Sequence, residues 1–273
     1  MVGSHLCDYL LNETNWKIYG ICRWRSPLNN VDHLLKLSNN KNSKLNFLYA
    51  DLNDLSSLLE VLKRTKPKYI FHLAAQSFPQ ASFTEANITL DTNIIGTYNL
   101  LNAIRILKLN PFIHVCSSSE VFGRVPREKI PINENCNYHP ASPYAISKVG
   151  TDLIGRYFFE AYGLKTIITR MFTHTGPRRG DVFAESSFAK QIAMIEEKKI
   201  PPIIEVGNLD SLRTFADVRD AVRAYYILLT KNPKPGEVYN IGGEYTCSVR
   251  DMLNFLIKNF KIKNIKIRVD KKR

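Results

Sequence analysis

Short runs rich in β-branched and aromatic residues alternate with longer stretches of helical periodicity over the first part of the chain. These runs predict strands at 16–23, 44–51, 68–75, 111–118 and 164–171. Each is followed by roughly 10 to 20 residues of helical pattern, which is typical of right-handed βαβ units around a parallel sheet. The pattern therefore predicts an α/β fold with a doubly wound parallel sheet.

The alternation becomes less regular after about residue 180. Helices are predicted there at 186–199, 217–231 and 248–260, with short strands at 203–208, 237–241 and 265–270. We expect these elements to form a smaller second lobe beyond the sheet. The predicted domain boundaries are 1–172 and 173–273.

The longest helical stretch runs from Ser142 to Gly163. Ser142 followed by Pro143 is a favourable N-cap and first-turn pair, and Gly163 is a favourable C-terminal stop. The sequence therefore predicts one long helix with well-defined ends.

The composition is that of a globular protein, with 44% hydrophobic and 23% charged residues in a chain of 273. No apolar run approaches the ~20 residues needed to span a bilayer. The N-terminal segment contains Asp8, Glu13 and Lys17 where a signal peptide would have an apolar core. We expect a cytoplasmic protein with no membrane association.

The cysteines are odd in number and widely separated: Cys7, Cys22, Cys116, Cys136 and Cys247. They form no C-x-x-C pair, and no histidine lies at zinc-ligand spacing from them. This usage indicates reduced thiols, and it favours neither a disulfide framework nor a metal site.

The chain carries a net charge of +13, from 38 Lys and Arg against 25 Asp and Glu. Such an excess suits an anionic partner, such as nucleic acid, a membrane surface or a phosphorylated small molecule. Much of it sits near the C-terminus, at Lys258, Lys261, Lys263, Lys266, Arg268, Lys271, Lys272 and Arg273. Clusters of this kind are usually solvated tails, so no nucleic-acid partner is expected.

Candidate chemistry begins with Tyr144 and Lys148 in the predicted long helix. The i, i+4 spacing places both side chains on one helix face. A nearby ammonium favours the phenolate and lowers the pKa of a tyrosine, which is ~10 when unperturbed. Tyr144 would then serve as a general base near neutral pH. A half-buried tyrosine beside a surface lysine would show the same spacing.

A second group of polar residues, Ser117-Ser118-Ser119-Glu120, directly follows the predicted strand at 111–118. Hydroxyl groups at the carboxyl end of a parallel strand lie where doubly wound sheets bind ligands. Ser118 could hydrogen-bond a substrate hydroxyl while Tyr144 removes its proton. A serine-rich turn without a ligand is the alternative interpretation.

Several motifs together cover nearly the whole chain: HLAAQ (72–76), DTNIIGT (91–97), SSSEVFG (117–123), P-x-S-P-Y-A-x-S-K (140–148), Arg170, GPRRG (176–180) and GNLDSLR (207–213). In this order they resemble the extended short-chain dehydrogenase/reductases that act on nucleotide sugars, and among these the GDP-mannose 4,6-dehydratase family. The resemblance implies a Rossmann-like, dinucleotide-binding domain at 1–172 and a lobe at 173–273 that mainly binds a nucleotide sugar.

The resemblance also implies catalytic roles. Ser118 and Tyr144 would engage the 4-hydroxyl of the sugar, and Lys148 would hold the nicotinamide ribose and tune Tyr144. Glu120 would remove the C5 proton of the 4-keto intermediate and help water leave from C6. Oxidation at C4 acidifies C5–H, so one group acting first as base and then as acid suffices for elimination. The family usually has Thr at the position of Ser118, and a serine retains the hydroxyl.

The cofactor assignment depends on Arg23 and Arg25 after the predicted strand at 16–23. Arginine at this place accommodates a 2′-phosphate, whereas NAD-selective sites usually have an acidic residue there. NADP is therefore favoured, with NAD as the alternative. The remaining cofactor-binding residues implied by the resemblance are Gly3, Asp51, Leu52, Ala74, Ala75, Gln76 and Asn93.

The substrate-binding residues implied by the resemblance are Ser77, Ser119, Thr173, His174, Arg178, Arg179 and Arg213. Paired guanidinium groups suit the oxygens of a nucleotide diphosphate. Thr173-His174 stands where the dehydratases commonly have Asn-His. This difference leaves open a relative that acts on a GDP-heptose.

The family pattern G-x-x-G-x-x-G would end at Gly3, so two glycines and the first strand, roughly ten residues long, are expected to be missing. Relatives also continue beyond the position of Arg273. The chain is therefore expected to be truncated at both ends. A gap in the sheet is expected where the pyrophosphate would bind, and with it weaker cofactor binding or lower stability.

Two other functions remain open from the sequence. A redox enzyme that acts only at C4, such as an epimerase, reductase or dehydrogenase, would not need Glu120. A non-catalytic, RNA-binding member would not need Ser118, Tyr144 and Lys148. Relatives associate through helices beside the sheet, so a homodimer or homotetramer is expected.

Overall fold

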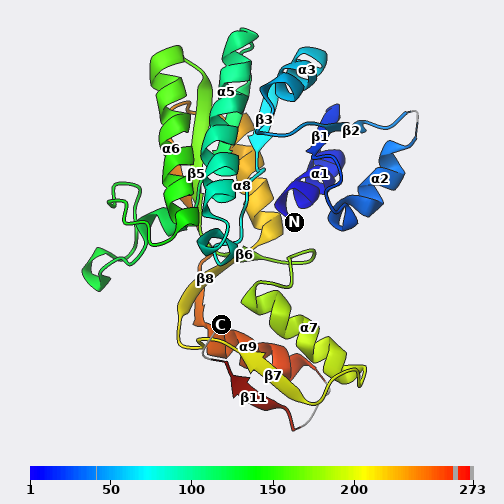
Figure 1. Cartoon of the computed structure of the whole chain (residues 1–273), viewed down its shortest axis with the longest axis vertical. Helices are drawn as coiled ribbons and strands as arrows, with labels where there is room; N and C mark the ends of the chain where they lie inside the picture. Colours follow the sequence, from blue (N-terminus) through cyan, green and yellow to red (C-terminus); the bar gives the residue numbers. More distant parts are fainter. Residues whose placement is uncertain (41, 261–263, 271–273) are drawn as a thin grey trace. The chain divides into compact units, whose positions relative to one another are not determined.

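The computed structural model describes residues 1–40, 42–260 and 264–270 (Figure 1). The chain forms two compact units. The larger consists of Val2–Phe172 and Val218–Ile241, and the smaller contains Met1, Thr173–Asp217 and the described residues from Gly242 onwards. Part of the predicted basic C-terminal cluster, namely Lys261, Lys263, Lys271, Lys272 and Arg273, lies outside the described residues.

Parallel strands form the centre of the larger unit. The first two, β1 (Ile18–Cys22) and β2 (Leu45–Tyr49), pair with each other in a two-stranded sheet. A second sheet has the order β3 (Tyr69–His72), β4 (Phe112–Cys116), β5 (Lys165–Met171) and β9 (Val238–Ile241), and all its pairs are parallel. The predicted α/β fold with a parallel sheet is therefore confirmed.

Among the described strands, none pairs with both β1 and β3. The sheet is thus divided where the motif pattern predicted a gap. Near the starts of β1 and β3, the indole of Trp16 stacks on the ring of Tyr69 at a centroid distance of 4.7 Å. This contact joins the two sheets by side-chain packing instead of backbone hydrogen bonds.

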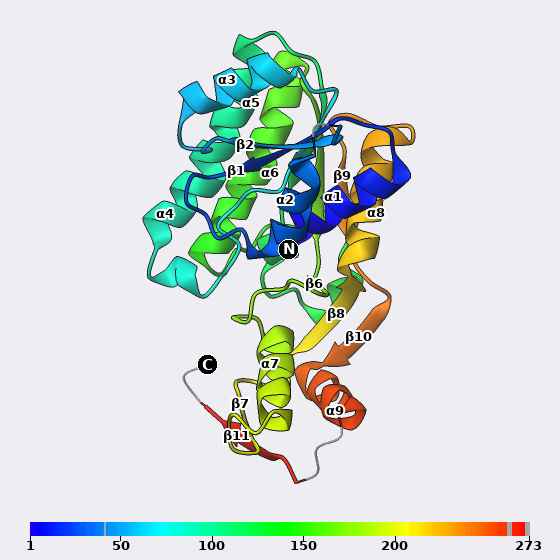
Figure 2. The ribbon, with the colours of Figure 1, turned by 90° about the vertical axis from the view of Figure 1, so that its right-hand side faces the viewer.

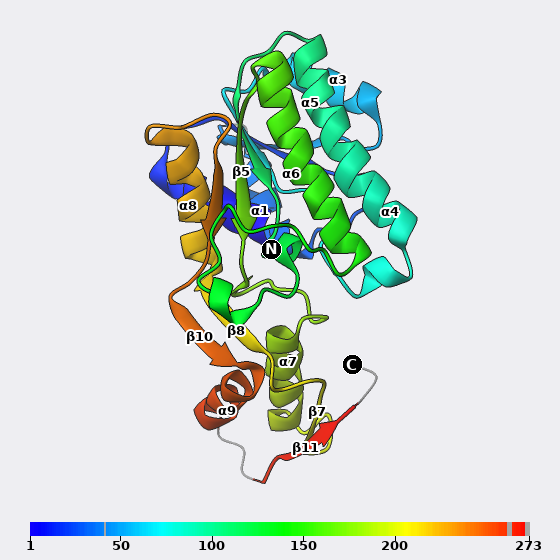
Figure 3. The ribbon, with the colours of Figure 1, turned by 90° about the vertical axis from the view of Figure 1, so that its left-hand side faces the viewer.

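Helices cover both faces of these strands. On one side lie α3 (Leu55–Thr65), α5 (Gly96–Ile106) and α6 (Pro143–Tyr162), and on the other α1 (Val2–Glu13) and α8 (Val218–Thr230) pack together (Figures 2 and 3). Two shorter helices, α2 (Asp32–Ser38) and α4 (Ala86–Leu90), also belong to the larger unit. Leu62, Leu101, Ile104, Ile113 and Phe158 belong to the apolar core under α3, α5 and α6.

The long helix predicted between Ser142 and Gly163 is α6. The Ser142 hydroxyl accepts a hydrogen bond from the backbone N–H of Ala145, and Pro143 opens the first turn. Gly163 ends the helix in the left-handed conformation, with φ of 68°. The cap residues thus fix both ends of the helix that carries Tyr144 and Lys148.

The smaller unit contains two further sheets. One has the order β10 (Tyr245–Ser248), β8 (Leu212–Asp217) and β6 (His174–Thr175), and the other pairs β11 (Lys266–Val269) with β7 (Ile203–Val206). Two helices, α7 (Ala184–Glu196) and α9 (Val249–Asn259), share an apolar core that includes Phe188, Ile192, Ile204 and Leu253. The strands β6, β8 and β10 were not predicted, because none of them contains a continuous apolar run.

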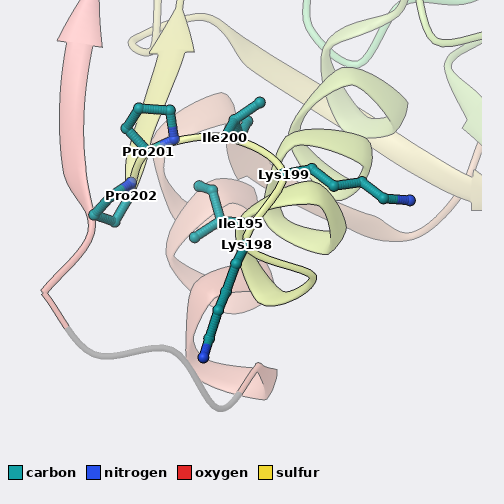
Figure 4. Close-up of a pocket in the computed structure, with 6 residues that line it drawn as sticks. All are labelled: Ile195, Lys198, Lys199, Ile200, Pro201 and Pro202. Carbon is teal, nitrogen blue, oxygen red and sulfur yellow. The ribbon is translucent and has the colours of Figure 1, made fainter.

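A hollow lies where α7 gives way to β7, lined by Ile195, Lys198, Lys199, Ile200, Pro201 and Pro202 (Figure 4). It contains none of the predicted site residues.

Within the described residues, no helix combines the length and the apolar character that crossing a bilayer requires. No disulfide joins the five cysteines, all of which lie in the described part of the chain.

Candidate active site

Tyr144 and Lys148 lie on one face of α6 and are both buried, with 8% and 5% of their surface exposed. The Lys148 Nζ lies 5.9 Å from the centroid of the Tyr144 ring. The backbone N–H of Tyr144 also donates to the hydroxyl of Ser82, at 3.1 Å. The helix therefore brings a phenol and an ammonium together in a largely dry environment.

The Lys148 ammonium is fixed by the end of β4. Its Nζ donates a hydrogen bond of 2.8 Å to the carbonyl oxygen of Cys116, the last residue of that strand. Burial lowers the pKa of Lys148. In this buried environment the positive charge of Lys148 acts more strongly on neighbouring groups than the charge of an exposed lysine would. The lowered pKa also makes Lys148 a more ready proton donor.

The polar turn predicted after β4 follows directly on this contact. The hydroxyl of Ser117 donates to the carbonyl oxygen of Lys148, at 3.1 Å. Ser118 caps the short helix η4 (Ser119–Phe122), because its hydroxyl accepts from the backbone N–H of Glu120 at 3.2 Å. The Glu120 residue is exposed, and η4 packs against α6. One strand end thus presents a hydroxyl and a carboxylate beside the helix of Tyr144.

Asn93 connects the loop after β3 to α6. It lies in a π-helical turn, η3 (Asp91–Ile95), and is 1% exposed. Its Oδ1 accepts from the backbone N–H of Gln76 at 2.8 Å, and its Nδ2 donates to the carbonyl of Gln76 and to the hydroxyl of Ser147, at 2.9 and 2.8 Å. Such π-turns are frequent at functional sites, and this one aligns the predicted cofactor loop with the Tyr144 helix.

Two buried histidines lie near this helix and were not predicted as part of the site. The Nε2 of His72 is 2.9 Å from the Thr97 hydroxyl, and that of His114 is 2.7 Å from the Thr169 hydroxyl. Burial lowers the pKa of each to about 3, with smaller contributions from Lys148 to His72 and from His72 and Lys148 to His114. Both rings are therefore neutral at pH 7. Their position in apolar strand runs was the only available signal, and it also suits core histidines.

The predicted cofactor residues follow the carboxyl ends of successive strands. Arg23 and Arg25 come after β1 and are exposed, Asp51 and Leu52 come after β2, and Ala74, Ala75 and Gln76 come after β3. Because β1 and β2 are parallel, the arginines and Asp51 share one edge. Gly3 lies in the first turn of α1, where an added Cβ would meet nothing within 4 Å.

The predicted substrate residues are divided between the two units. Ser77 and Ser119 belong to the larger unit, while Thr173, His174, Arg178, Arg179 and Arg213 belong to the smaller. The Arg179 Nε lies 3.2 Å from Glu185, and its guanidinium lies 3.6 Å from the centroid of the Phe183 ring. Arg213 is exposed on β8. Among the described residues, no group of three or more His, Cys, Asp or Glu side chains could hold a metal ion.

Comparison with known proteins places this arrangement in a family. A sequence profile described as "GDP-mannose 4,6 dehydratase" matches residues 1–273. The chain belongs to the GDP-mannose 4,6-dehydratase family. The resemblance inferred from the motifs is thereby confirmed.

Individual relatives agree with this membership. A GDP-mannose 4,6-dehydratase of Vibrio cholerae is 33% identical over 256 residues, which cover 92% of this chain and 67% of the relative. The human GDP-mannose 4,6 dehydratase is 33% identical over 258 residues, with coverages of 92% and 67%. A solved structure of RMD from Pseudomonas aeruginosa, complexed with NADPH, matches with a TM-score of 0.81 and 28% identity. The match covers 94% of this chain and 88% of the RMD chain.

Proposed function

We propose that this protein converts a GDP-hexose, GDP-mannose in the first instance, into the 4-keto-6-deoxy sugar. The observation that carries the proposal is the joining of the Ser118–Glu120 turn to the helix of Tyr144 and Lys148. Ser117 and Lys148 hydrogen-bond at the junction, and η4 packs on α6. A C4-only enzyme needs the tyrosine and the lysine, whereas water elimination also needs a carboxylate such as Glu120.

The roles follow from the chemistry of each group. Tyr144 accepts the proton of the sugar 4-hydroxyl, which Ser118 orients by a hydrogen bond. The buried Lys148 ammonium stabilises the negative charge that the Tyr144 oxygen carries before it accepts this proton. Glu120 then removes the proton from C5 of the ketone and returns it to the hydroxyl that leaves C6 as water. Tyr144 finally returns its proton when the double bond is reduced.

The residues of the larger unit fit a dinucleotide. We assign Arg23 and Arg25 to the 2′-phosphate of NADP, because exposed guanidiniums at a strand end suit phosphate oxygens. When bound, the nicotinamide supplies the acceptor and then the donor of the hydride that passes from C4 to C6. Asp51 and Leu52 are assigned to the adenine, and Ala74, Ala75, Gln76 and Asn93 to the phosphates and ribose. Gly3 completes the assigned set, and NAD is the alternative cofactor.

We carry the substrate-binding residues over from the family resemblance. Arg178, Arg179 and Arg213 are proposed to hold the diphosphate of the GDP-sugar, and Ser77, Ser119, Thr173 and His174 to contact the sugar or its phosphates. Thr173 replaces the common asparagine, so GDP-heptose is the second substrate to test. The predicted division at 172/173 would then separate dinucleotide binding from nucleotide-sugar binding, except that 218–241 belongs to the larger unit.

The exposed surface of α5 and α6 supports a homo-oligomer. It carries exposed apolar and aromatic side chains at Tyr98, Ile106, Ile146, Leu153, Tyr157 and Tyr162. A large apolar patch on a helix pair is typical of a protein interface. We propose a cytoplasmic homodimer or homotetramer formed through this face, with no nucleic acid or membrane as partner.

Incubation of the purified protein with NADP and GDP-mannose tests the proposal. We expect a product lighter by one water in the mass spectrum. A product of unchanged mass with inverted C4 would indicate an epimerase, and a ketone of unchanged C6 would indicate a 4-dehydrogenase. GDP-heptose in a parallel incubation decides the choice of sugar.

A further inference from the structure

A buried arginine outside the predicted catalytic set connects three segments of the larger unit. Arg170, near the end of β5, is 2% exposed. Its Nε donates to Asp152 Oδ2 at 2.8 Å, its Nη2 to the Tyr138 hydroxyl at 2.7 Å, and its Nη1 to the carbonyl oxygen of Glu134 at 2.7 Å. One guanidinium thus reaches α6 and two points of the loop that precedes this helix.

The same guanidinium also contacts the turn that bears Glu120. Its central carbon lies 5.3 Å from the centroid of the Phe122 ring, and Phe122 is a buried residue of η4. The backbone N–H of His139, next to Tyr138, donates to the carbonyl of Val121 at 2.9 Å. The Glu120 turn is therefore attached to the Arg170 side chain directly and through the loop.

Charge and burial restrict the positions of the side chains around Arg170. Asp152 is fully buried, and Arg156 and Arg170 both pair with it, at 2.9 and 2.8 Å. Tyr138 donates to Asp152 at 2.8 Å and accepts from both arginines. Burial and the neighbouring carboxylate raise the pKa of Tyr138 to about 12, so its phenol stays a donor throughout the neutral range. A buried charge with several hydrogen bonds permits little displacement of its partners.

Asp152 stands one helical turn after Lys148 on α6. We propose that Arg170 is a positioning residue that holds the Glu120 turn in register with the Tyr144 and Lys148 face of this helix. Only a planar guanidinium can hydrogen-bond to Asp152, Tyr138 and the Glu134 carbonyl together, so lysine is an inadequate replacement. The functional consequence rests on the proposed dehydratase activity.

Loss of the Arg170 guanidinium is expected to affect one of the two chemical steps more than the other. Tyr144 and Lys148 keep contacts of their own, with the Ser82 hydroxyl and the Cys116 carbonyl. The Glu120 turn loses its attachment to α6 through Arg170. Elimination of water should therefore suffer more than oxidation at C4.

The test compares Arg170→Lys and Tyr138→Phe with Arg223→Lys. Arg223 makes the matched control, because it pairs with Asp220 on α8 at 3.9 Å and is 62% exposed. In Arg170→Lys we expect elimination to fall by roughly 100-fold while cofactor reduction by GDP-mannose changes by less than about threefold, since small displacements of a catalytic group have large effects on rate. Tyr138→Phe should show the same direction with a smaller loss.

Hydrogen–deuterium exchange gives a readout that does not depend on the activity. In Arg170→Lys, peptides covering 119–139 should exchange at least about tenfold faster, while those covering 144–162 should match the control. Equal acceleration throughout the chain, or none in 119–139, would overturn the proposal even if the enzyme acts on another sugar. If wild-type protein does not dehydrate GDP-mannose but exchange changes locally, the substrate assignment fails and the positioning role stands.

Discussion

The Lys148 ammonium donates to the carbonyl oxygen of Cys116 at 2.8 Å, and this contact fixes the Tyr144 helix to the strand end from which the Ser118–Glu120 turn begins. Two segments more than twenty residues apart in the sequence thus meet here, and the Ser117 hydroxyl adds a second hydrogen bond to the Lys148 carbonyl oxygen at 3.1 Å. Ser118 and Glu120 follow the end of β4, and Tyr144 and Lys148 lie in the first two turns of α6. The contact between these two segments brings the four side chains to one edge of the sheet.

Glu120→Gln separates elimination from oxidation. The amide keeps the size of the side chain but cannot accept the C5 proton, so water loss should fall by roughly 100-fold or more. Reduction of NADP by GDP-mannose, followed by absorbance at the nicotinamide wavelength, should persist. An enzyme that acts at C4 alone would show no water loss with either protein, and its cofactor reduction would be unchanged by the substitution.

Arg23→Ala and Arg25→Ala test the cofactor assignment. Removal of a charged hydrogen-bond donor from a phosphate typically costs about 1.5–3 kcal/mol, which is roughly 10- to 100-fold in affinity. NADPH binding, measured by its fluorescence, should weaken by this factor, and NADH binding should change little. Arg64→Ala, at an exposed position of α3, is the control. Equal weakening of both cofactors would assign the two arginines elsewhere.

The buried histidines predict a pH dependence of stability. The folded-state pKa values of His72 and His114 are lowered to about 3, below the value of about 6.5 expected when unfolded. As the pH falls below about 6.5 the unfolded chain binds these protons and the folded chain does not, so stability declines toward pH 3. Each histidine contributes up to about 1.4 kcal/mol per pH unit in this range.

Urea unfolding of wild type and His114→Phe measures this effect. The variant keeps an aromatic ring beside Tyr225, whose centroid lies 4.2 Å from the His114 ring. Its loss of stability between pH 6 and pH 5 should be smaller than that of wild type by about 1 kcal/mol. Between pH 8 and pH 7 the two slopes should agree. Parallel curves over the whole range would contradict the prediction.

Two glycines with positive φ differ in the space around them. Gly123, at the end of η4, has φ of 55°, and an added Cβ would lie 1.9 Å from the carbonyl oxygen of His139. Gly163, with φ of 68°, has nothing within 4 Å. Gly163→Ala should cost about 1 kcal/mol of unfolding free energy. Gly123→Ala should cost several times more, because the backbone of the Glu120 turn must move.

Thermal or urea unfolding of both glycine variants measures this difference. Gly123→Ala should also lower elimination activity, because relief of the collision with the His139 carbonyl displaces the turn that carries Glu120. Equal stability losses in the two variants would show that the turn adjusts without cost.

Local patterns allowed much of the fold to be predicted. The βαβ alternation gave the parallel strands, and Ser142 with Gly163 gave the ends of α6, because burial periodicity and capping are properties of neighbouring residues. The strands β6, β8 and β10 escaped prediction, since their pairing depends on partners distant in the sequence. The π-turn at Asn93 escaped for a similar reason, because its hydrogen bonds reach Gln76 and Ser147.

By itself, the sequence determined the family, the α/β class and the spacing that places Tyr144 and Lys148 on one helix face. Only the tertiary structure decided that Lys148 is held by the Cys116 carbonyl, that His72 and His114 are neutral, and that Arg170, Asp152 and Tyr138 form one buried network. Motifs record which residues are present along the chain. Burial and long-range hydrogen bonds depend on which segments meet in space, and these set the charge and position of each group.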